Sequence, residues 1–259
     1  MDERWPELRE RCRVEEDAAV VALNKPAGIS VTGERHDTDI VRLAAEVGET
    51  LYPVHRIDKV TSGLVLFAKD LGAHGQLTRQ FNKRTAEKTY LAVTASTGLP
   101  ERGVIELPLS VGRKNRVRIA APREAIVRDG DEWSVPERDL LAGKNYPSRT
   151  EFITVSRGEE HTVLAVRPVT GRRHQIRVHL AWIGHPIAGD PLFDRSETHP
   201  RTHLHSWRLR VDAPWRDTGE LALEAVPGPD FWLVGATRIT DDPSALLDAV
   251  SLPERSGGH

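Results

Sequence analysis

The chain has 259 residues, a formal net charge of −2 and 29% charged side chains, a length that suits one large domain or two small ones and can bury a substantial core. It has no run of about 18 apolar residues and no apolar segment near its start, so we expect neither a membrane span nor a signal peptide. The single cysteine, Cys12, excludes an internal disulfide, has no partners for a structural zinc site, and favours the cytoplasm.

The small net charge argues mildly against a nucleic-acid partner, since such domains are often basic, but the basic residues are grouped. The three groups are Arg79, Lys83, Arg84 and Lys88; Arg113, Lys114, Arg116 and Arg118; and Arg172, Arg173 and Arg177. Arginine suits phosphate because of its planar fork of donors. An arginine-rich genome would explain the excess of arginine over lysine equally well. The grouping of basic residues is therefore better evidence for a nucleic-acid partner than the ratio of arginine to lysine.

The first elements follow from apolar runs and their breaks. Residues 1–13 are expected to form a short polar helix or a loose end. The apolar run 18–23 predicts a buried strand that stops at the loop NKPAG, 24–28. Residues 39–47 carry apolar side chains at helical spacing, so we expect a short amphipathic helix closed by Gly48.

The stretch 52–69 reads YPVHRIDKVTSGLVLFAK. Its apolar part, 64–68, follows Gly63 and has the length of a buried strand. Arg56, Asp58 and Thr61 then lie in a loop anchored by that strand, where catalytic groups are often held. An aspartate beside Thr-Ser-Gly is also typical of a simple turn, in which the carboxylate accepts a hydrogen bond from its own backbone.

Residues 73–84 are expected to form a helix, because Leu77 and Phe81 lie four apart on one face. Arg79 and Lys83 form a basic stripe on another face. The segment 87–93 predicts a strand that is polar at its start and apolar at its end, with Tyr90 near its middle.

The middle of the chain alternates between strands and breaks. Residues 103–119 predict strands interrupted by Pro108 and Gly112. Residues 121–147 are polar and charged with little periodicity, so we expect a long surface excursion. The segments 148–155 and 162–169 predict a pair of strands joined by a turn.

A second motif, TGRRHQIRVHL at 170–180, is followed by GHPIAGD at 184–190. Ile176, Leu180 and Ile183 lie at helical spacing and predict a helix with one apolar stripe toward the core. Arg173 and Arg177 are expected on a neighbouring face of that helix. Spacing alone favours an ordinary surface position for Arg177.

Both motifs resemble those of the RluA-type pseudouridine synthases. That family has His-Arg-Leu-Asp, two variable residues, Thr-Ser-Gly-Leu and an apolar strand ending in Ala-Lys, and the one departure here is Ile57. It also has Thr-Gly-Arg-x-His-Gln-Leu/Ile-Arg-x-His before Gly-His-Pro-Ile-x-Gly-Asp. Three weaker matches are the loop at 24–28, a Lys-x-Tyr-x-Ala segment around Tyr90, and a Leu-His-Ala segment in which Ser206 stands for alanine.

The resemblance implies an α+β fold: a single catalytic domain with a mixed, mostly antiparallel sheet, flanking helices and a central active-site cleft. It covers roughly residues 18–234, preceded by an extension at 1–17 and followed by a tail at 235–259. The tail is expected to hold a weakly packed helix and a disordered end. The small RNA-binding domain found in many relatives is not expected here, because only 17 residues precede the first matched strand.

By the same resemblance, Asp58 is the catalytic residue, Arg177 pairs with it, and Tyr90 lies near the target base and serves in proton transfer. The residues expected to bind substrate are Arg56, which would hold a displaced nucleotide, Ile176, which would pack beside the uracil, and Thr61, His174, Arg173 and Lys25. Lys25 is placed at the rim of the site, although a lysine before Pro-Ala-Gly is by default a solvated turn residue.

Conversion of uridine to pseudouridine breaks the N1–C1′ bond and joins C5 to C1′ without redox change, so no cofactor is expected and none of the phosphate-binding glycine loops occurs. It needs a carboxylate in a water-poor pocket, kept ionised by an arginine partner. The sequence leaves open whether Asp58 attacks C1′ or the reaction passes through a glycal, with Tyr90 or Asp58 removing the 2′ proton. The uridine must leave the RNA stack to react.

Two alternatives remain. The first is a metal-dependent hydrolase built from histidines and acids, which are His174, His179, His185, His199, His203, His205, Asp190 and Asp194. The spacing argues against it, since His174 and His179 would point to different helix faces and no His-Glu-x-x-His occurs, so no metal is expected. The second is an RNA-binding protein without catalysis. The expected partner is ribosomal or transfer RNA, and the expected state is a monomer.

Overall fold

The computed structural model describes residues 4–33, 39–194 and 200–250, apart from the side chain of Lys114. One large sheet of twelve strands organises the chain. Ten strands follow one another across it in the order β1 (Arg13–Glu16), β2 (Val20–Lys25), β4 (Ser62–Ala68), β13 (Leu204–Asp212), β5 (Glu87–Thr94), β12 (Thr162–Pro168), β11 (Thr150–Arg157), β6 (Arg102–Glu106), β10 (Glu132–Ser134) and β9 (Val127–Asp129). The strands β3 (Tyr52–Pro53) and β14 (Glu220–Glu224) pair with β4 and β13 respectively.

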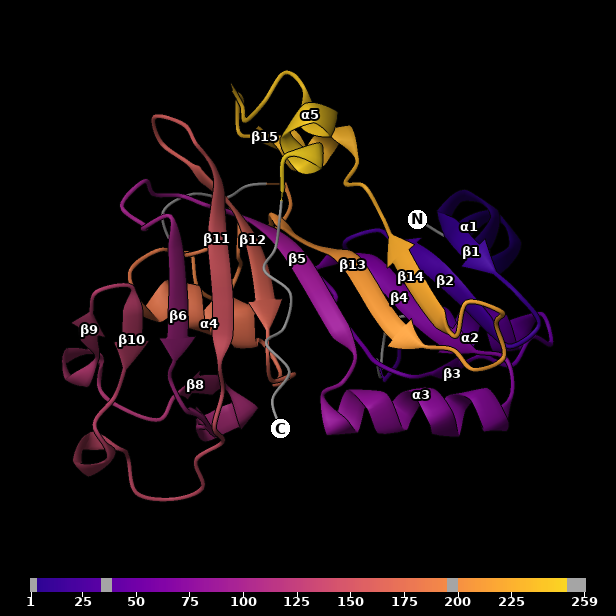
Figure 1. The fold of residues 1–259 in the computed structure, drawn as a ribbon, viewed down its shortest axis with the longest axis horizontal. Helices are drawn as coiled ribbons and strands as arrows, with labels where there is room; N and C mark the ends of the chain where they lie inside the picture. Colours follow the sequence, from indigo (N-terminus) through magenta and orange to yellow (C-terminus); the bar gives the residue numbers. More distant parts are fainter. Residues whose placement is uncertain (1–3, 34–38, 195–199, 251–259) are drawn as a thin grey trace.

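The sheet is mixed and mostly antiparallel, because only the β13–β4 and β10–β6 pairs are parallel among the strands of the described residues. Two small hairpins lie beside it, β7 (Leu109–Val111) with β8 (Val117–Ile119), and β15 (Leu233–Val234) with β16 (Thr237–Arg238). The helices are α1 (Trp5–Cys12), α2 (Ile40–Glu46), α3 (Leu71–Lys83), α4 (Gln175–Trp182) and α5 (Pro243–Asp248). The predicted α+β class is confirmed (Figure 1).

Alternate residues of the central strands feed different apolar clusters, as a pleated strand buried on both faces requires. All seven residues of β4 are buried. Val65 and Phe67 pack with α1, α2 and α4, whereas Leu64 and Leu66 pack with Leu77 of α3. The sheet is therefore covered on both sides, and the loops at its strand ends stand on a rigid base.

The predicted α4 is present, but the expectation of a single apolar stripe is wrong. Every residue from Gln175 to Ala181 is buried. The reason is that α4 lies between β11 and β12 on one side and the β7–β8 hairpin on the other, with Val178 and Leu180 in the same cluster as Val117 and Ile119. A helix enclosed on both sides has no solvent face for a charged residue to occupy.

Of the two alternatives for residues 1–13, the helix is confirmed over Trp5–Cys12, and Trp5, Leu8 and Cys12 are buried in it. The excursion 121–147 differs from expectation, because β10 extends the sheet beside β6 and Trp133 packs on Phe152 with ring centroids 6.0 Å apart. Pairing with β6 stabilises this strand, which is too short to show a periodicity in the sequence.

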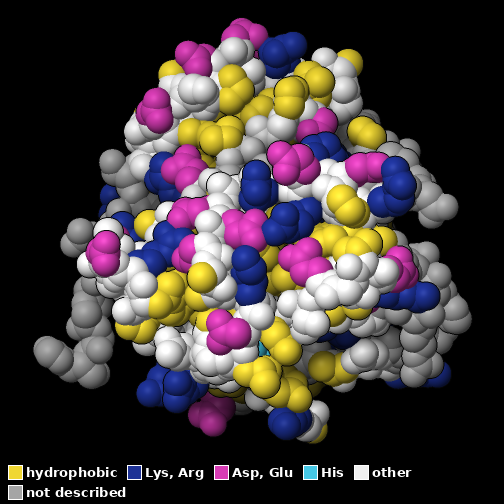
Figure 2. All heavy atoms as spheres, turned by 90° about the vertical axis from the view of Figure 1, so that its right-hand side faces the viewer, with side chains coloured by type: hydrophobic (Ala, Val, Ile, Leu, Met, Phe, Trp, Pro, Cys, Tyr) yellow, Lys and Arg dark blue, Asp and Glu magenta, His cyan; other side chains and the backbone are white. Residues whose placement is uncertain are grey.

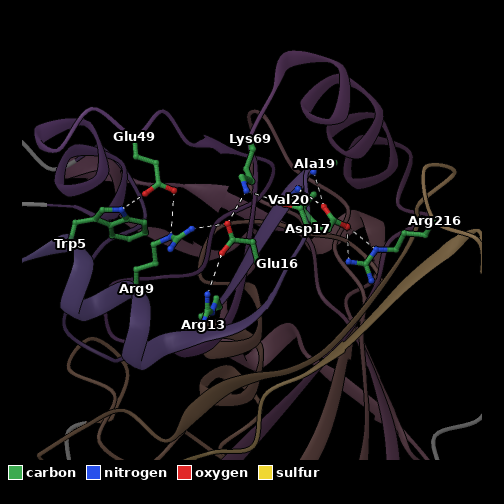
Figure 3. A network of polar contacts seen from close by, with 10 residues as sticks. All are labelled: Trp5, Arg9, Arg13, Glu16, Asp17, Ala19, Val20, Glu49, Lys69 and Arg216. Carbon is green, nitrogen blue, oxygen red and sulfur yellow. Dashed lines mark hydrogen bonds and ion pairs between the residues drawn. The ribbon is translucent and has the colours of Figure 1, made fainter.

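Ion pairs attach the N-terminal elements to the sheet (Figure 3). Glu16 of β1 accepts hydrogen bonds from Arg9 at 2.6 Å and from Lys69 at 2.8 Å, and Asp17 pairs with Arg216 at 2.6 Å. Burial raises the pKa of Glu16, but the bond from Lys69 and the charge of Arg9 outweigh it and hold the pKa below its usual range. Figure 2 shows acidic and basic side chains intermixed over the face that carries α1 and β1.

The short helix predicted in the tail is present as α5, but it follows β16 and it is packed, since Leu247 is buried in the same cluster as Phe231 and Trp232. The starting residues 1–3 and the end 251–259 lie outside the described residues. Within the part of the chain that is described, no helix combines the length and the apolar character that crossing a membrane requires.

Gly63 sits where the parallel strands β4 and β13 meet. Its φ is +105°, and a Cβ placed on it would lie 2.2 Å from the backbone oxygen of Ser206, the residue that pairs with it. Both the left-handed backbone and the close approach of β13 exclude any other residue. This gives a physical reason for the glycine of the Thr-Ser-Gly motif.

We expect Gly63→Ala to lower the free energy of unfolding by about 3 kcal/mol or more, because backbone strain and overlap with β13 add. Gly28→Ala is the matched control, since Gly28 has φ +97° and open space around it, and strain alone costs about 1–2 kcal/mol. Denaturant unfolding of both variants measures the difference, and equal losses would contradict the close-approach argument.

Candidate active site

A cavity of about 340 Å³ opens between the loop before β4, the strand β5 and the segment that leads into α4. Eight of the nine predicted site residues line it: Arg56, Asp58, Thr61, Tyr90, Arg173, His174, Ile176 and Arg177. The topology brings together residues up to 121 positions apart in the chain, because β4 and β5 flank β13 in the sheet. Lys25 does not line the cavity.

Asp58 lies in the turn that precedes β4, where the amide of Thr61 donates to its carbonyl at 3.0 Å. Its carboxylate is 24% exposed, and Oδ2 accepts a hydrogen bond from Nη1 of Arg177 at 2.8 Å. The Nε2 atom of His174 lies 3.7 Å from Oδ1. The carboxylate is thus held from one side and open to the cavity on the other.

Arg177 is 3% exposed and holds two carboxylates at once. Its Nε and Nη2 donate to Asp190 at 2.6 and 2.9 Å, while Nη1 reaches Asp58. Burial lowers the pKa of Arg177, but Asp190 and Asp58 outweigh it and raise that pKa above its usual value. The surface position that spacing favoured is wrong, and Arg177 cannot contribute to a phosphate-binding patch.

Asp190 is the site residue to which the resemblance assigned no role, although it was named among the acids of the hydrolase alternative. It is fully buried, it grips Arg177 in a bidentate pair, and its Oδ1 accepts hydrogen bonds from the amides of Leu192 and Phe193. Its place as the last residue of the second motif was the available signal. The arrangement fixes the guanidinium, so that Nη1 can point only toward Asp58.

Tyr90 lines the cavity from β5 and is paired in register with Ser206 of β13. Burial raises the pKa of Tyr90 to about 12, against the opposing effect of a hydrogen bond with the Ser206 side chain. A phenol with this pKa is a proton donor at neutral pH. Tyr90 is therefore poorly suited to remove a proton as a base.

Gln175 shapes the loop that leads into α4. Its side chain bonds Thr170 and the amide of Arg172 on one side and the carbonyl of Arg149 on the other. His174 follows with a left-handed backbone, φ +56°, so the helix starts only at Gln175. The expectation that Arg173 and Arg177 share a helix face is wrong, because Arg173 precedes the helix.

His174 is half-buried at the start of α4. Burial lowers its pKa, Asp58 raises it, and Arg177 and Arg173 lower it again, with a net shift below the usual value. His174 is therefore neutral at pH 7. The positive charge beside Asp58 comes from Arg177.

Lys25 lies beneath the site, and its predicted place at the rim is wrong. It is 0% exposed, and Nζ donates to the carbonyls of Pro26, Ile29 and Lys59. Burial lowers the pKa of Lys25 to about 7, with Asp58 acting in the opposite direction. Lys25 ties the loop after β2 to the turn that carries Asp58, a structural position that its proline neighbour did not indicate.

The histidines do not form a metal site among the residues that the structure describes, and His199 lies outside them. His179 contacts Thr150 and the carbonyl of Leu107, and His205 contacts Ser62 and the carbonyl of Ala225. Burial lowers the pKa of each to about 4. Both are neutral packing residues whose ring nitrogens contact protein groups.

Comparison with known proteins shows that the chain is similar in sequence to RNA pseudouridine synthases. A family model described as RNA pseudouridylate synthase matches residues 19–182. The chain is 34% identical to "Dual-specificity RNA pseudouridine synthase RluA" of Vibrio vulnificus, over 81% of this chain and 79% of that protein. It is 33% identical to "Ribosomal large subunit pseudouridine synthase D" of Nitrosomonas europaea, over 93% of this chain and 66% of that protein.

The fold is shared with solved structures. "Human RNA Pseudouridylate Synthase Domain Containing 4" superposes with a TM-score of 0.68 and 24% identity, covering 85% of this chain and 90% of that one. "Human RNA Pseudouridylate Synthase Domain Containing 1" gives the same score at 21% identity, covering 92% and 93% of the two chains.

We expect Asp190→Asn to lower the free energy of unfolding by about 3–5 kcal/mol, because it leaves the buried Arg177 with less charge compensation. The matched control is Glu46→Gln, which breaks an exposed pair with Arg42 and should change stability by no more than about 0.5 kcal/mol. Urea titrations of the wild type and the two variants measure the free energy of unfolding. A small loss of stability for Asp190→Asn would show that the buried charge of Arg177 does not need Asp190 for compensation.

The lowered pKa of Lys25 makes stability depend on pH. Between about pH 7 and 10.5 the unfolded chain holds a proton on Lys25 that the folded chain has released, so the free energy of unfolding should rise with pH in that window. Lys25→Met should remove this part of the rise. The exposed Lys83→Met is the control and should keep the wild-type slope in unfolding experiments at pH 7 and 9.5, while an unchanged slope in Lys25→Met would refute the assignment.

Proposed function

The chain belongs to the RNA pseudouridylate synthase family, whose members isomerise uridine to pseudouridine, and we propose that Asp58 carries this reaction on a uridine taken out of its RNA. The observation that supports Asp58 is its position: one carboxylate at the cavity wall, bonded to a buried arginine at 2.8 Å and 24% exposed. A carboxylate so placed is held by a cation on one side and is still accessible to a substrate on the other.

The isomerisation breaks the N1–C1′ bond, joins C5 to C1′, moves the C5 proton away and leaves a proton on N1, so that the product has the composition of the substrate. In one route the Asp58 carboxylate attacks C1′ and the uracil leaves, turns and attacks C1′ through C5, which releases Asp58. In the other Asp58 removes the 2′ proton as the N1–C1′ bond breaks to give a glycal, and it returns that proton to C2′ when C5 joins C1′. We favour Asp58 for either role because Tyr90, with a pKa of about 12, is suited to donate a hydrogen bond to the uracil or ribose.

The cavity has the volume of a small-ligand site, which runs from about 300 to 1,000 Å³, and therefore suits one extruded nucleotide. Ile176 is 6% exposed at its wall and offers an apolar surface to the uracil. Arg56 is exposed at the mouth, where it can hold the displaced strand. Taking the nucleotide out of the stack costs a few kcal/mol, which contacts of this kind must offset.

The names of the relatives indicate which class of RNA is the substrate. One relative is named for the ribosomal large subunit and another as a dual-specificity RNA enzyme, and we propose ribosomal RNA, transfer RNA or both as substrate. The chain spans 66% of the first relative's length. We place the catalytic unit at residues 18–234, with 1–17 and 235–259 as its extensions, and propose that it acts as a monomer in the cytoplasm, where its thiol Cys12 would stay reduced.

We expect Asp58→Asn to abolish pseudouridine formation and to leave RNA binding within about threefold, because the substitution keeps the shape of the side chain and removes the charge that the chemistry needs. Carbodiimide labelling of unmodified ribosomal RNA, followed by primer extension, reports the product, and filter binding reports affinity.

Asp129→Asn is the matched control, since Asp129 is exposed on β9 away from the cavity, and it should retain full activity. Product at the wild-type rate from Asp58→Asn would remove Asp58 from the mechanism. Binding without product from the wild-type chain would instead favour an RNA-binding protein without catalysis.

A further inference from the structure

A second cavity, of about 270 Å³, lies beside the first and shares Arg172 and Arg173 with it. The β7–β8 hairpin forms one wall, and Tyr146 forms another. The lining is Leu109, Ser110, Val111, Asn115, Val117, Tyr146, Arg172 and Arg173. It combines an aromatic ring, aliphatic side chains and two cations, and it includes no carboxylate.

Tyr146 is held firmly in place. Its amide donates to the carbonyl of Leu109 at 2.8 Å, and its own carbonyl accepts from the amide of Leu109 at 2.9 Å. The Ser148 hydroxyl also donates to the Tyr146 carbonyl, at 2.9 Å. The ring is half-buried, with the guanidinium of Arg172 5.5 Å from its centroid and the ammonium of Lys144 5.3 Å from it. The backbone of Tyr146 is therefore fixed beside the hairpin, and its half-buried ring offers an aromatic surface at the cavity wall.

The two shared arginines differ in their contacts. Arg173 donates to the carbonyl and the side-chain oxygen of Asn115, which fixes it against the hairpin. The guanidinium of Arg172 has neither a hydrogen-bond partner nor an ion pair among the described residues, and its Nε is buried without a partner. A cation without a carboxylate partner, at the boundary of two cavities, is suited to bind an anion that spans both.

We propose that this second cavity binds the nucleotide next to the target uridine, with its base stacked on Tyr146 and the connecting phosphodiester between Arg172 and Arg173. The proposal rests on the proposed function, because the uridine must occupy the first cavity for its neighbour to reach the second. A single phosphodiester suffices to connect them, since the two cavities share these arginines. Stacking on an aromatic ring and contact with phosphate are how proteins grip single-stranded RNA.

The test compares ligands that fill one cavity or two. Calorimetric titration of the full chain would use uridine 5′-monophosphate, the 5′-phosphorylated dinucleotide pUpU, and the same dinucleotide with an abasic second residue. We expect pUpU to bind about tenfold tighter than the monophosphate, and the abasic ligand to lose most of that gain. Equal binding of the monophosphate and pUpU would overturn the proposal without any variant being made.

Variants then show which residues produce the tighter binding of pUpU. Tyr146→Ala should remove most of the advantage of pUpU and leave the monophosphate unchanged, whereas Tyr146→Phe should retain it. Arg172→Gln should weaken pUpU and reduce the slope of log affinity against log salt by about one. The exposed Arg138→Gln is the matched control and should change neither. A Tyr146→Ala variant with wild-type melting temperature and an undiminished pUpU advantage would refute the subsite.

The outcomes separate this proposal from the proposed function. Ribosomal RNA modified normally by a chain that shows no pUpU advantage would refute the second cavity and leave Asp58 catalysis standing. A pUpU advantage that depends on Tyr146, in a chain that makes no pseudouridine, would support the cavity and refute the isomerisation.

Discussion

The site depends on one buried guanidinium placed between two carboxylates. Arg177 donates three hydrogen bonds, two to Asp190 and one to Asp58. The two acids differ in their surroundings. Asp190 is fully buried and also receives two backbone amides, whereas Asp58 keeps an open side toward the cavity. Because Asp190 is the fixed anchor, the arginine cannot turn away when substrate arrives. The carboxylate of Asp58 is therefore held in position by a cation that is itself fixed.

The fold supplies the rigidity that this pair needs. Asp58 lies one turn before a strand whose every residue is buried. The glycine at the start of that strand allows β13 to approach closely at Ser206, the residue that pairs with Tyr90. From the opposite side, α4 is enclosed between the sheet and the β7–β8 hairpin. Lys25 then ties the Asp58 turn to the loop after β2 from below. Each contact restrains a backbone segment rather than the Asp58 side chain itself, which is how a pocket is preorganised.

The features that could be predicted from the sequence are those set by the local spacing of apolar residues. The strands around Leu64 and Tyr90, the helix around Leu77 and the two motifs were found because apolar spacing and punctuation are local properties. What was missed depends on distant partners. Lys25 has a turn-like neighbourhood but is buried by residues far along the chain, and α4 is enclosed by a hairpin that its own spacing cannot reveal. Asp190 is part of the second motif, but only the folded structure shows that it pairs with Arg177.

Charge placement explains how a chain of net charge −2 can serve an RNA substrate. On the face that carries α1 and β1 the acids and bases are intermixed and largely compensate one another (Figure 2). Around the two cavities the balance is different: Asp58 is already compensated by Arg177, so Arg56, Arg172 and Arg173 add positive charge that no lining carboxylate cancels. A polyanion is attracted by the local field over a distance of about 8–10 Å at physiological salt. Net charge therefore says little about the partner, and the distribution of charge around Asp58 says much more.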